Sequence, residues 1–209
     1  MEKQMSVLKF CLAVIAAYLL GSISVAVLLT KKQYKQDVRG CGSGNAGATN
    51  VARVFGMKAG VITFIGDLLK TAAAVTVGGL LLGETGKCAA AAACLIGHCY
   101  PVFFGFRGGK GVTVSAAVAL VLDVRFFLFL VAVFFLVFLA ARTVSVSSVS
   151  CAIAYPVGML LFGHTALAPM LLSAFVTVFV IFLHRANIKR ILSGTEPKFK
   201  AKNDRAERR

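Results

Sequence analysis

The sequence predicts an all-α integral membrane protein with about seven transmembrane helices. We expect one polytopic membrane domain over residues 1–196 and a basic, disordered cytoplasmic tail over residues 197–209. Three observations support this class. Hydrophobic residues make up 58% of the 209-residue chain, against about 45–50% in an ordinary globular protein. The mean hydropathy is +0.85. The net charge of +15 lies in short stretches between apolar segments, as in loops that flank membrane spans.

The predicted spans are apolar segments that could cross a hydrocarbon core about 30 Å thick. They cover residues 8–30, 59–82, 88–104, 112–122, 126–141, 146–162 and 165–183. The segment 112–122 is short for a crossing, and the phenylalanine-rich segment 126–141 is expected to face lipid. We expect the first span to be retained, with a cleaved signal peptide as the alternative.

The orientation follows from the distribution of basic residues. One set of loops, together with the C-terminal tail, holds nearly all the lysine and arginine. The other set holds only Lys3, Lys9, Lys87 and Arg125. Because the basic-rich side of a membrane protein is cytoplasmic, we expect the N-terminus outside and the C-terminus in the cytoplasm. This orientation places three polar segments on the same cytoplasmic face.

The composition also argues against several partners. Nucleic acid is not expected, because the basic residues adjoin hydrophobic segments instead of lining one groove or helix face. The cysteines form no Cys-x-x-Cys pair and lie mostly in apolar runs, so we interpret them as small hydrophobic residues. They are Cys11, Cys41, Cys88, Cys94, Cys99 and Cys151. No Cys/His cluster has ligand spacing, so we expect no metal and no cofactor. No obligatory protein partner is evident either.

The first polar segment, RGCGSGNAGATNVAR, covers residues 39–53. Its glycines let the backbone turn and direct several N–H groups toward one point. Arg39 and Arg53 flank it with fixed charges that match phosphate or carboxylate. The G-x-G-x-x-G pattern from Gly42 to Gly47 is typical of dinucleotide folds, but those require a preceding strand. Here the pattern joins two membrane spans, so we predict an oxyanion site.

The second polar segment, GFRGGKG, covers residues 105–111. It is not a Walker A loop, because Phe104 occupies the place of the first glycine and Gly111 that of the Ser or Thr. Glycine N–H groups beside Lys110 nevertheless suit phosphate oxygens. The alternative for Lys110 is contact with lipid headgroups.

Polar side chains also occur at the predicted spans. Asp67 and Lys70 are three residues apart, so they either form a mutual ion pair or help to frame a polar site. His98 precedes Tyr100-Pro101 and has the alternative of bonding loop backbone. His184 ends the last span, where it could instead satisfy helix C-terminal carbonyls.

Common catalytic motifs are missing from the sequence. There is no G-x-S-x-G nucleophile elbow, no paired-carboxylate site, and no histidine followed five positions later by aspartate. A serine-hydrolase mechanism is therefore not expected.

Three motifs together resemble the bacterial acyl-phosphate:glycerol-3-phosphate acyltransferases. They are GSGNAGATNVAR at residues 42–53, GHCYPVFFGFRGGKGV at 97–112 and HRANIKRILSGTE at 184–196. The resemblance implies a multi-pass enzyme of the bacterial inner membrane, with its active site on the cytoplasmic side. It implies transfer of a fatty acyl group from acyl phosphate to glycerol 3-phosphate, giving lysophosphatidic acid and phosphate in phospholipid synthesis. Departures occur at Ala46, where proline is common, at Thr113-Val114, where Ala-Thr is more usual, and at Tyr100, which replaces phenylalanine.

The motifs assign roles to particular residues. The expected catalytic residues are Ser43, Lys110 and His184. Those expected to bind substrate phosphate or glycerol 3-phosphate are Gly44, Asn45, Gly47, Thr49, Asn50, Arg53, Gly108, Gly109, Gly111, Asn187, Arg190 and Glu196. Asp67, Lys70 and His98 are possible supporting residues. The proton acceptor is left open between His184 and a substrate phosphate oxygen.

A transporter of organic phosphates is the alternative function. It would share the anion-binding loops and the polar pair within a span. It also predicts polar residues at the midplane and inverted symmetry between the halves of the chain. The polar residues here are concentrated on one face, which favours an enzyme.

Overall fold

The computed structural model describes residues 2–200, and every regular element in that range is helical. The all-α prediction is therefore confirmed. The elements are α1 (Glu2–Gly21), α2 (Val25–Tyr34), η1 (Val38–Gly40), α3 (Ala48–Phe55), α4 (Met57–Cys99), η2 (Val102–Phe104), α5 (Val112–Leu122), α6 (Val124–Ala141), α7 (Val144–Leu161), α8 (Leu167–Leu183) and α9 (Arg185–Leu192). Most of the tail that was predicted to be disordered, residues 201–209 of 197–209, lies outside the described residues.

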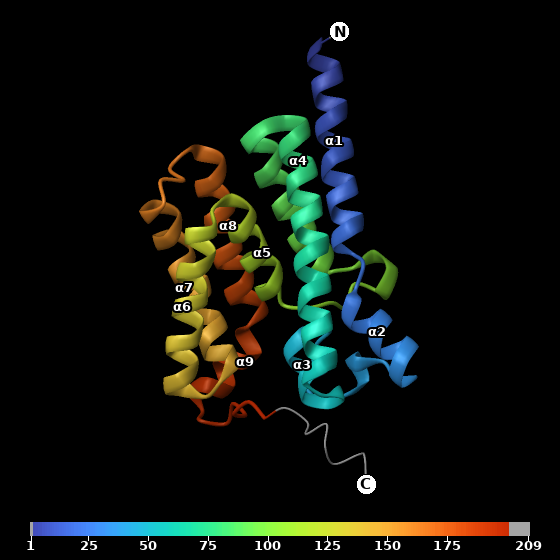
Figure 1. The fold of residues 1–209 in the computed structure, drawn as a ribbon, viewed down its shortest axis with the longest axis vertical. Coiled ribbons are helices and arrows are strands. Elements are labelled where there is room, and N and C mark those ends of the chain that lie inside the picture. The colour runs from blue at the N-terminus through green and yellow to red at the C-terminus, as the bar shows by residue number, and fades with distance from the viewer. Residues whose placement is uncertain (1, 201–209) are drawn as a thin grey trace.

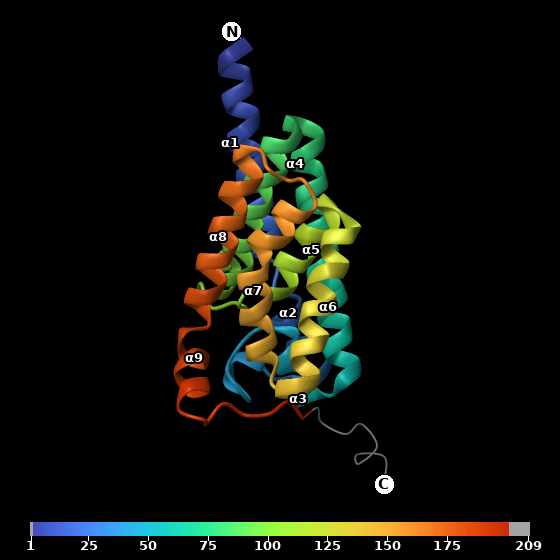
Figure 2. The ribbon, with the colours of Figure 1, turned by 90° about the vertical axis from the view of Figure 1, so that its left-hand side faces the viewer.

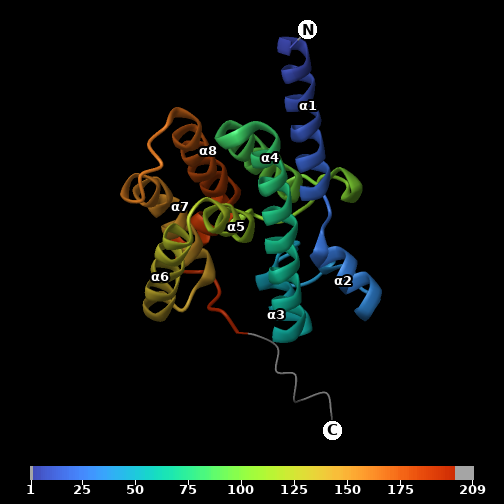
Figure 3. The ribbon, with the colours of Figure 1, turned by 45° about the horizontal axis from the view of Figure 1, so that its top comes forward.

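The helices form a bundle whose two ends differ in role. In Figure 1, α1 begins at the upper end and the described chain finishes at the lower end, near α3 and α9. Figure 3 shows α5 between two groups of helices, with α1 and α4 on one side and α6, α7 and α8 on the other. The polar loops that carry the predicted site residues therefore meet in the lower half of the bundle.

Helix α4 doubles back on itself. A straight helix of 43 residues would be about 65 Å long, far longer than one membrane crossing. Leu82 and Gly83 have non-helical dihedral angles, with φ of +63° at Gly83, and Figure 1 shows the chain turning there. The two arms are the predicted spans 59–82 and 88–104, except that the second arm ends at Cys99.

Several helices are long and apolar enough to cross a membrane. Four segments of the described chain meet this test, and α8 with α9, which are bent by 60° at their junction, would make a fifth. One of the four segments contains both arms of α4, and α5, with 11 residues, is short. The predicted count of seven crossings and the predicted orientation remain predictions.

The predicted first span, residues 8–30, is broken between α1 and α2. Ser24 caps α2 by accepting a hydrogen bond from the Val27 N–H at 3.4 Å. Glycines let α1 lie directly on the second arm of α4. A Cβ atom at Gly21 would be 2.3 Å from the Cys94 oxygen, and one at Gly97 would be 2.2 Å from the Tyr18 oxygen. Such close approach through small residues is typical of packed membrane helices.

The main core joins the second arm of α4 to α5, α6, α7 and α8. Phe126 of α6 is fully buried and lies edge-on against Tyr155 of α7, with ring centroids 4.8 Å apart. Leu136 and Leu139 of α6 are exposed on the bundle surface. The expectation that segment 126–141 faces lipid is therefore wrong for one side of the helix, which packs into the core.

Candidate active site

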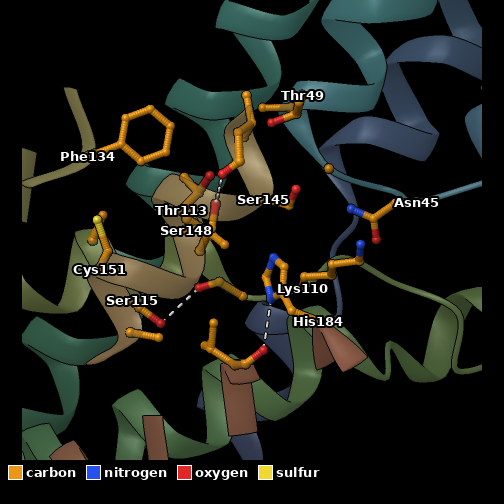
Figure 4. A pocket seen from close by; sticks show the side chains of 18 of the residues that line it. Asn45, Thr49, Lys110, Thr113, Ser115, Phe134, Ser145, Ser148, Cys151 and His184 are labelled. Carbon is orange, nitrogen blue, oxygen red and sulfur yellow. Dashed lines mark hydrogen bonds between the residues drawn. The ribbon is translucent and has the colours of Figure 1, made fainter. Parts of the chain in front are cut away.

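A cavity of about 340 Å³ opens in the lower half of the bundle. One end is polar and is formed by α3, by the second glycine loop and by α9. The other end is an apolar wall from α4 and α6 to α8. The wall consists mainly of Phe64, Phe127, Leu130, Val131, Phe134, Ala152, Tyr155, Val176 and Val180. In Figure 4, Asn45, Lys110 and His184 lie toward one side of the cavity and Phe134 and Cys151 toward the other.

The first glycine loop is organised by Asn50, which is 1% exposed. Its amide nitrogen donates to the carbonyl oxygens of Val38, Cys41 and Asn45 at 3.2, 3.0 and 3.0 Å. Its amide oxygen accepts from the Ser43 N–H at 2.9 Å. Asn50 was predicted to bind substrate, but its hydrogen-bonding groups are used to shape the loop.

Gly42 shows why the loop needs glycine beside Asn50. Its φ is +58°, and a Cβ atom there would lie 2.4 Å from the Asn50 amide oxygen. With the loop held in this way, the Ser43 side chain lines the cavity. Its hydroxyl makes no hydrogen bond with the described part of the chain, so it is free to meet a ligand.

The N-terminus of α3 adjoins the same cavity. Gly47 precedes the helix and offers no side-chain cap, while Ala48 and Thr49 line the cavity. Arg53 follows one turn after Thr49 and is half-buried. Within residues 2–200 it makes no hydrogen bond or ion pair. Free amides at a helix N-terminus together with an unpaired guanidinium form a site for an anion.

The second glycine loop is bound to the end of α4. The Gly108 N–H donates to the Cys99 oxygen and the Gly109 N–H to the His98 oxygen, each at 3.1 Å. These amides are therefore not free for phosphate, contrary to the sequence prediction, and neither glycine lines the cavity. The loop needs glycine for close approach, since a Cβ atom at Gly109 would be 2.1 Å from His98 Nε2.

The two glycine loops contact each other, and the second presents another helix end to the cavity. The Ala46 N–H donates to the Gly108 oxygen at 3.4 Å. Gly111, with φ of +80°, precedes α5 without a side-chain cap, and Gly111, Val112 and Thr113 line the cavity. Two uncapped helix N-termini thus face one cavity.

Lys110 belongs to a polar network that reaches α9. Its ammonium group donates to the side-chain oxygen of Asn187. The Asn187 amide nitrogen donates to Glu196 at 2.6 Å, and so do Arg190 Nε and the Ser145 hydroxyl. Burial lowers the pKa of Lys110, and the positive charge of Arg190 adds to this effect. For Glu196, partial burial opposes ionisation, but these hydrogen bonds hold the pKa below its ordinary value.

His184 lies at the junction of α8 and α9 and is 3% exposed. Its Nδ1 is 2.8 Å from the Val180 oxygen. Because a carbonyl oxygen can only accept, Nδ1 carries the proton, and Nε2 of the neutral ring keeps its lone pair. The ring therefore satisfies a helix carbonyl, as the alternative reading proposed. It also leaves an acceptor at the cavity, whose lining includes His184.

Asp67, Lys70 and His98 form a buried cluster behind the second loop. Lys70 Nζ lies 2.8 Å from Asp67 Oδ1 and 3.3 Å from His98 Nδ1. It also donates to the oxygens of Gly21 and Ile23, at 3.0 and 2.6 Å. Those carbonyls belong to the break between α1 and α2, where helix carbonyls lose their partners. Asp67 and Lys70 therefore form an ion pair with each other. Asp67 and His98 also line the cavity, whereas Lys70 does not.

Arg39 does not line the cavity, although the sequence suggested that it flanks the anion site. Its guanidinium pairs with Asp37 at 2.8 Å and donates to the Phe104 oxygen. The hydrogen bond from Arg39 holds the pKa of Asp37 below its usual range. Arg39 therefore ties the first loop to η2.

Most of the predicted site residues converge on the cavity. Those that line it are Ser43, Asn45, Gly47, Thr49, Asn50, Arg53, Asp67, His98, Lys110, Gly111, His184, Asn187, Arg190 and Glu196. Gly44, Gly108, Gly109 and Lys70 do not line it.

The sequence reasoning missed the contributions of α6 and α7. Ser145 and Ser148 of α7 line the cavity, as do Phe127 and Phe134 of α6. Helix α7 carries four serines in its first two turns, and the three-residue spacing of Ser145 and Ser148 puts those two hydroxyls on one face. That spacing was the available signal. The phenylalanines carried no such signal, because lipid-facing and cavity-facing side chains are equally apolar.

The fold and the cavity define a polytopic helical membrane protein whose cavity is polar at one end and apolar along its wall. The chain belongs to the glycerol-3-phosphate acyltransferase family, whose model matches residues 11–194. The glycerol-3-phosphate acyltransferase of Syntrophotalea carbinolica is 44% identical over 92% of this chain and 98% of that protein. The Geobacillus kaustophilus enzyme of the same name is 43% identical over 90% of this chain and 95% of its own length.

Solved structures agree with this assignment. The glycerol 3-phosphate form of PlsY (YgiH), an integral membrane glycerol 3-phosphate acyltransferase, matches with a TM-score of 0.86 at 35% identity. The match covers 91% of this chain and 96% of that chain. The lysophosphatidic acid form of the same protein matches with a TM-score of 0.84 at 34% identity, covering 91% and 95%. The predicted membrane class and acyltransferase family are confirmed.

Proposed function

We propose that this chain transfers a fatty acyl group from acyl phosphate to glycerol 3-phosphate, giving lysophosphatidic acid and phosphate. One observation carries the proposal: a single cavity joins a cationic, amide-rich end to an apolar wall. An acyl phosphate has both a phosphate and a hydrocarbon chain, and its phosphate and carbonyl would lie where the two parts of the cavity meet. The product, lysophosphatidic acid, has the same amphiphilic character.

The cations at the polar end match the charge of two phosphate-bearing substrates. Arg53 and the N-terminus of α3 bind one phosphoryl group, together with the Ser43 hydroxyl. Asn187 and Arg190 bind glycerol 3-phosphate, and Lys110 neutralises charge between the two. Positioned charges of this kind stabilise the developing oxyanion and orient the reactants.

The reaction then needs one displacement. A free hydroxyl of glycerol 3-phosphate attacks the acyl carbon, a new C–O ester bond forms, and the bond from the acyl carbon to the phosphate oxygen breaks. The phosphate leaves with the electron pair of that bond. The hydroxyl proton passes to His184 Nε2 or to a substrate phosphate oxygen. Because phosphate is a good leaving group, the proposal includes no covalent enzyme intermediate, no metal and no cofactor.

The proposed reaction takes place at the bacterial inner membrane. The enzyme crosses that membrane about seven times, with the site on the cytoplasmic face. The basic bias of the loops supports this orientation. Glycerol 3-phosphate, a soluble anion, would enter from that face without crossing the apolar part of the bundle. No protein partner is required.

Donor identity can be tested with purified protein reconstituted in lipid vesicles. Acyl phosphate, acyl-CoA and acyl-loaded carrier protein are supplied in turn, with glycerol 3-phosphate and a chelator. We expect turnover with acyl phosphate alone. Comparable rates with acyl-CoA, or loss of activity on chelation, would contradict the proposal.

A matched variant tests the absence of an acyl-enzyme. Cys41 is the one cysteine of the first glycine loop, and its thiol lies 3.7 Å from the Asp37 oxygen. Cys41→Ala should therefore keep the turnover of the wild type with acyl phosphate. A folded but inactive Cys41→Ala protein would indicate covalent catalysis instead.

A further inference from the structure

The chain that follows α9 crosses the polar end of the cavity as a strap, which we define as residues 193–200. Figure 2 shows it running from the foot of α9 along the lower end of the bundle. The family model matches the chain only as far as residue 194. Residues 195–200 of the strap therefore lie beyond the part of the chain that the family model matches.

Phe199 anchors the strap at the turn between α6 and α7. Its N–H donates to the Arg142 oxygen at 3.0 Å. Its ring lies 6.2 Å from the Phe138 ring, centroid to centroid, at an angle of 67°. Phe199 is half-buried, whereas Lys198 and Lys200 on either side are exposed. Only the phenylalanine of this short stretch is used for packing.

Glu196, three residues before the anchor, enters the cavity. Its side chain is 9% exposed and accepts hydrogen bonds at 2.6 Å from Ser145 of α7 and from Asn187 and Arg190 of α9. The carboxylate therefore bridges α7 and α9. Asn187 in turn accepts from Lys110, so the position of Glu196 affects the whole polar end.

Helix α9 has little packing of its own to hold it there. Of its eight residues only Asn187 is buried. The first part of the strap turns back on α9 itself, with the N–H groups of Thr195 and Glu196 donating to the Arg190 oxygen at 2.8 and 3.2 Å. The strap contacts the rest of the bundle at two points: Glu196 accepts from Ser145 of α7, and Phe199 packs on Phe138 of α6.

We propose that Phe199 is a positioning residue for the acyl acceptor. By fixing the strap to the α6–α7 turn it holds Glu196 against Ser145, and so sets Asn187 and Arg190 opposite Lys110. This inference rests on the proposed function, in which Asn187 and Arg190 bind glycerol 3-phosphate. Glu196 contacts Asn187 and Arg190 directly and reaches Lys110 only through Asn187, so we expect the anchor to affect the acceptor more than the donor.

The test compares Phe199→Ala with Phe199→Tyr in the full-length protein, with Lys198→Ala and Lys200→Ala as matched controls from the same strap. Phe199→Ala should raise the KM for glycerol 3-phosphate about tenfold, since an aromatic pair with its buried area contributes on that scale. The KM for the donor should rise far less, and the melting temperature should stay at its wild-type value. Phe199→Tyr should restore the KM, and the lysine variants should match the wild type.

A second variant shows whether the anchor acts through Glu196. Ser145→Ala should also raise the KM for glycerol 3-phosphate. The double variant Ser145→Ala with Phe199→Ala should raise this KM by less than the product of the two single increases, because both residues hold the same carboxylate. An unchanged KM in Phe199→Ala would overturn the inference. So would a rise of equal size in both substrates' KM, or a lowered melting temperature with an unchanged KM.

Direct binding separates this inference from the proposed function. Glycerol 3-phosphate is titrated into wild type and Phe199→Ala by calorimetry without donor. Absence of binding to the wild type would overturn the proposed acceptor site, and the inference with it. Equal Kd values for the two proteins would overturn the inference alone. A weaker Kd in Phe199→Ala supports both.

Discussion

Asn50→Ala tests whether the first glycine loop is built around one buried amide. The substitution removes two N–H groups that are shared among three carbonyl oxygens, and one accepted hydrogen bond. At about 1 kcal/mol net for each hydrogen bond, the sum is about 3 kcal/mol if nothing replaces them. Because the loop adjoins a polar cavity, water can serve some of the freed groups, and we expect a loss of about 2–3 kcal/mol in the free energy of unfolding.

The assay is thermal unfolding of purified protein in detergent, followed with a thiol-reactive dye. Cys88, Cys94 and Cys99 are buried, so the dye signal rises when the fold opens. Asn50→Ala should melt well below the wild type. Asn50→Asp should melt lower still, since a carboxylate would face three carbonyl oxygens.

Arg53→Ala is the matched control, because Arg53 lines the same cavity and pairs with nothing in residues 2–200. It should melt like the wild type and lose only activity. An Asn50→Ala protein that melts normally and shows only a raised KM would refute this reasoning. Asn50 would then bind substrate directly, as the sequence first suggested.

The other predictions concern charge. Lys110→Ala and Arg53→Ala should each lower kcat/KM by about 10²–10³, as for loss of a preorganised charge. Near-full activity in both folded variants would show that these loops are not part of the active site. The lowered pKa of Lys110 means that its ammonium is lost on the alkaline side at lower pH than for an ordinary lysine. Lys110→Arg should therefore extend the alkaline limb of kcat/KM to higher pH. Lys70→Met should cost up to about 3–5 kcal/mol of stability, because the buried Asp67 carboxylate would keep only His98, 3.6 Å away, as a partner. Adding Asp67→Asn should recover part of that loss, and equal melting of the single and double variants would contradict the ion pair. A cysteine placed at Lys200, in a background without accessible native cysteines, should resist an impermeant thiol reagent in intact cells. Labelling there would reverse the proposed orientation.

The membrane class was predictable from the sequence, and so was the clustering of the motif residues around one cavity. Long apolar segments and the basic bias of alternate loops are local properties that can be read along the chain. The motifs that contain Ser43, Lys110 and His184 drew attention to residues that do line one cavity. We could expect the three motifs to converge, because loops at the same end of a small helical bundle lie close together.

The roles within the motifs required the tertiary structure. Glycine at 108 and 109 indicated free amides, yet both N–H groups donate to the end of α4. Asn50 resembled a ligand and holds the loop, while Arg39 resembled a second anion-binding group and pairs with Asp37. In each case the residue type states what a group can bind, and only the fold states which partner is near enough to take it.

The apolar wall and the strap were also beyond the sequence. Phe127 and Phe134 are as hydrophobic as their lipid-facing neighbours, so hydropathy alone cannot separate a cavity wall from a bundle surface. Phe199 lies in a short basic stretch that resembles a disordered tail, and its packing on Phe138 joins residues 61 positions apart. The sequence by itself determined which groups the protein has, and it predicted that they lie on one face. The packing of helices decided which of them are free for substrate, because a hydrogen bond or a buried ring depends on neighbours that are distant along the chain.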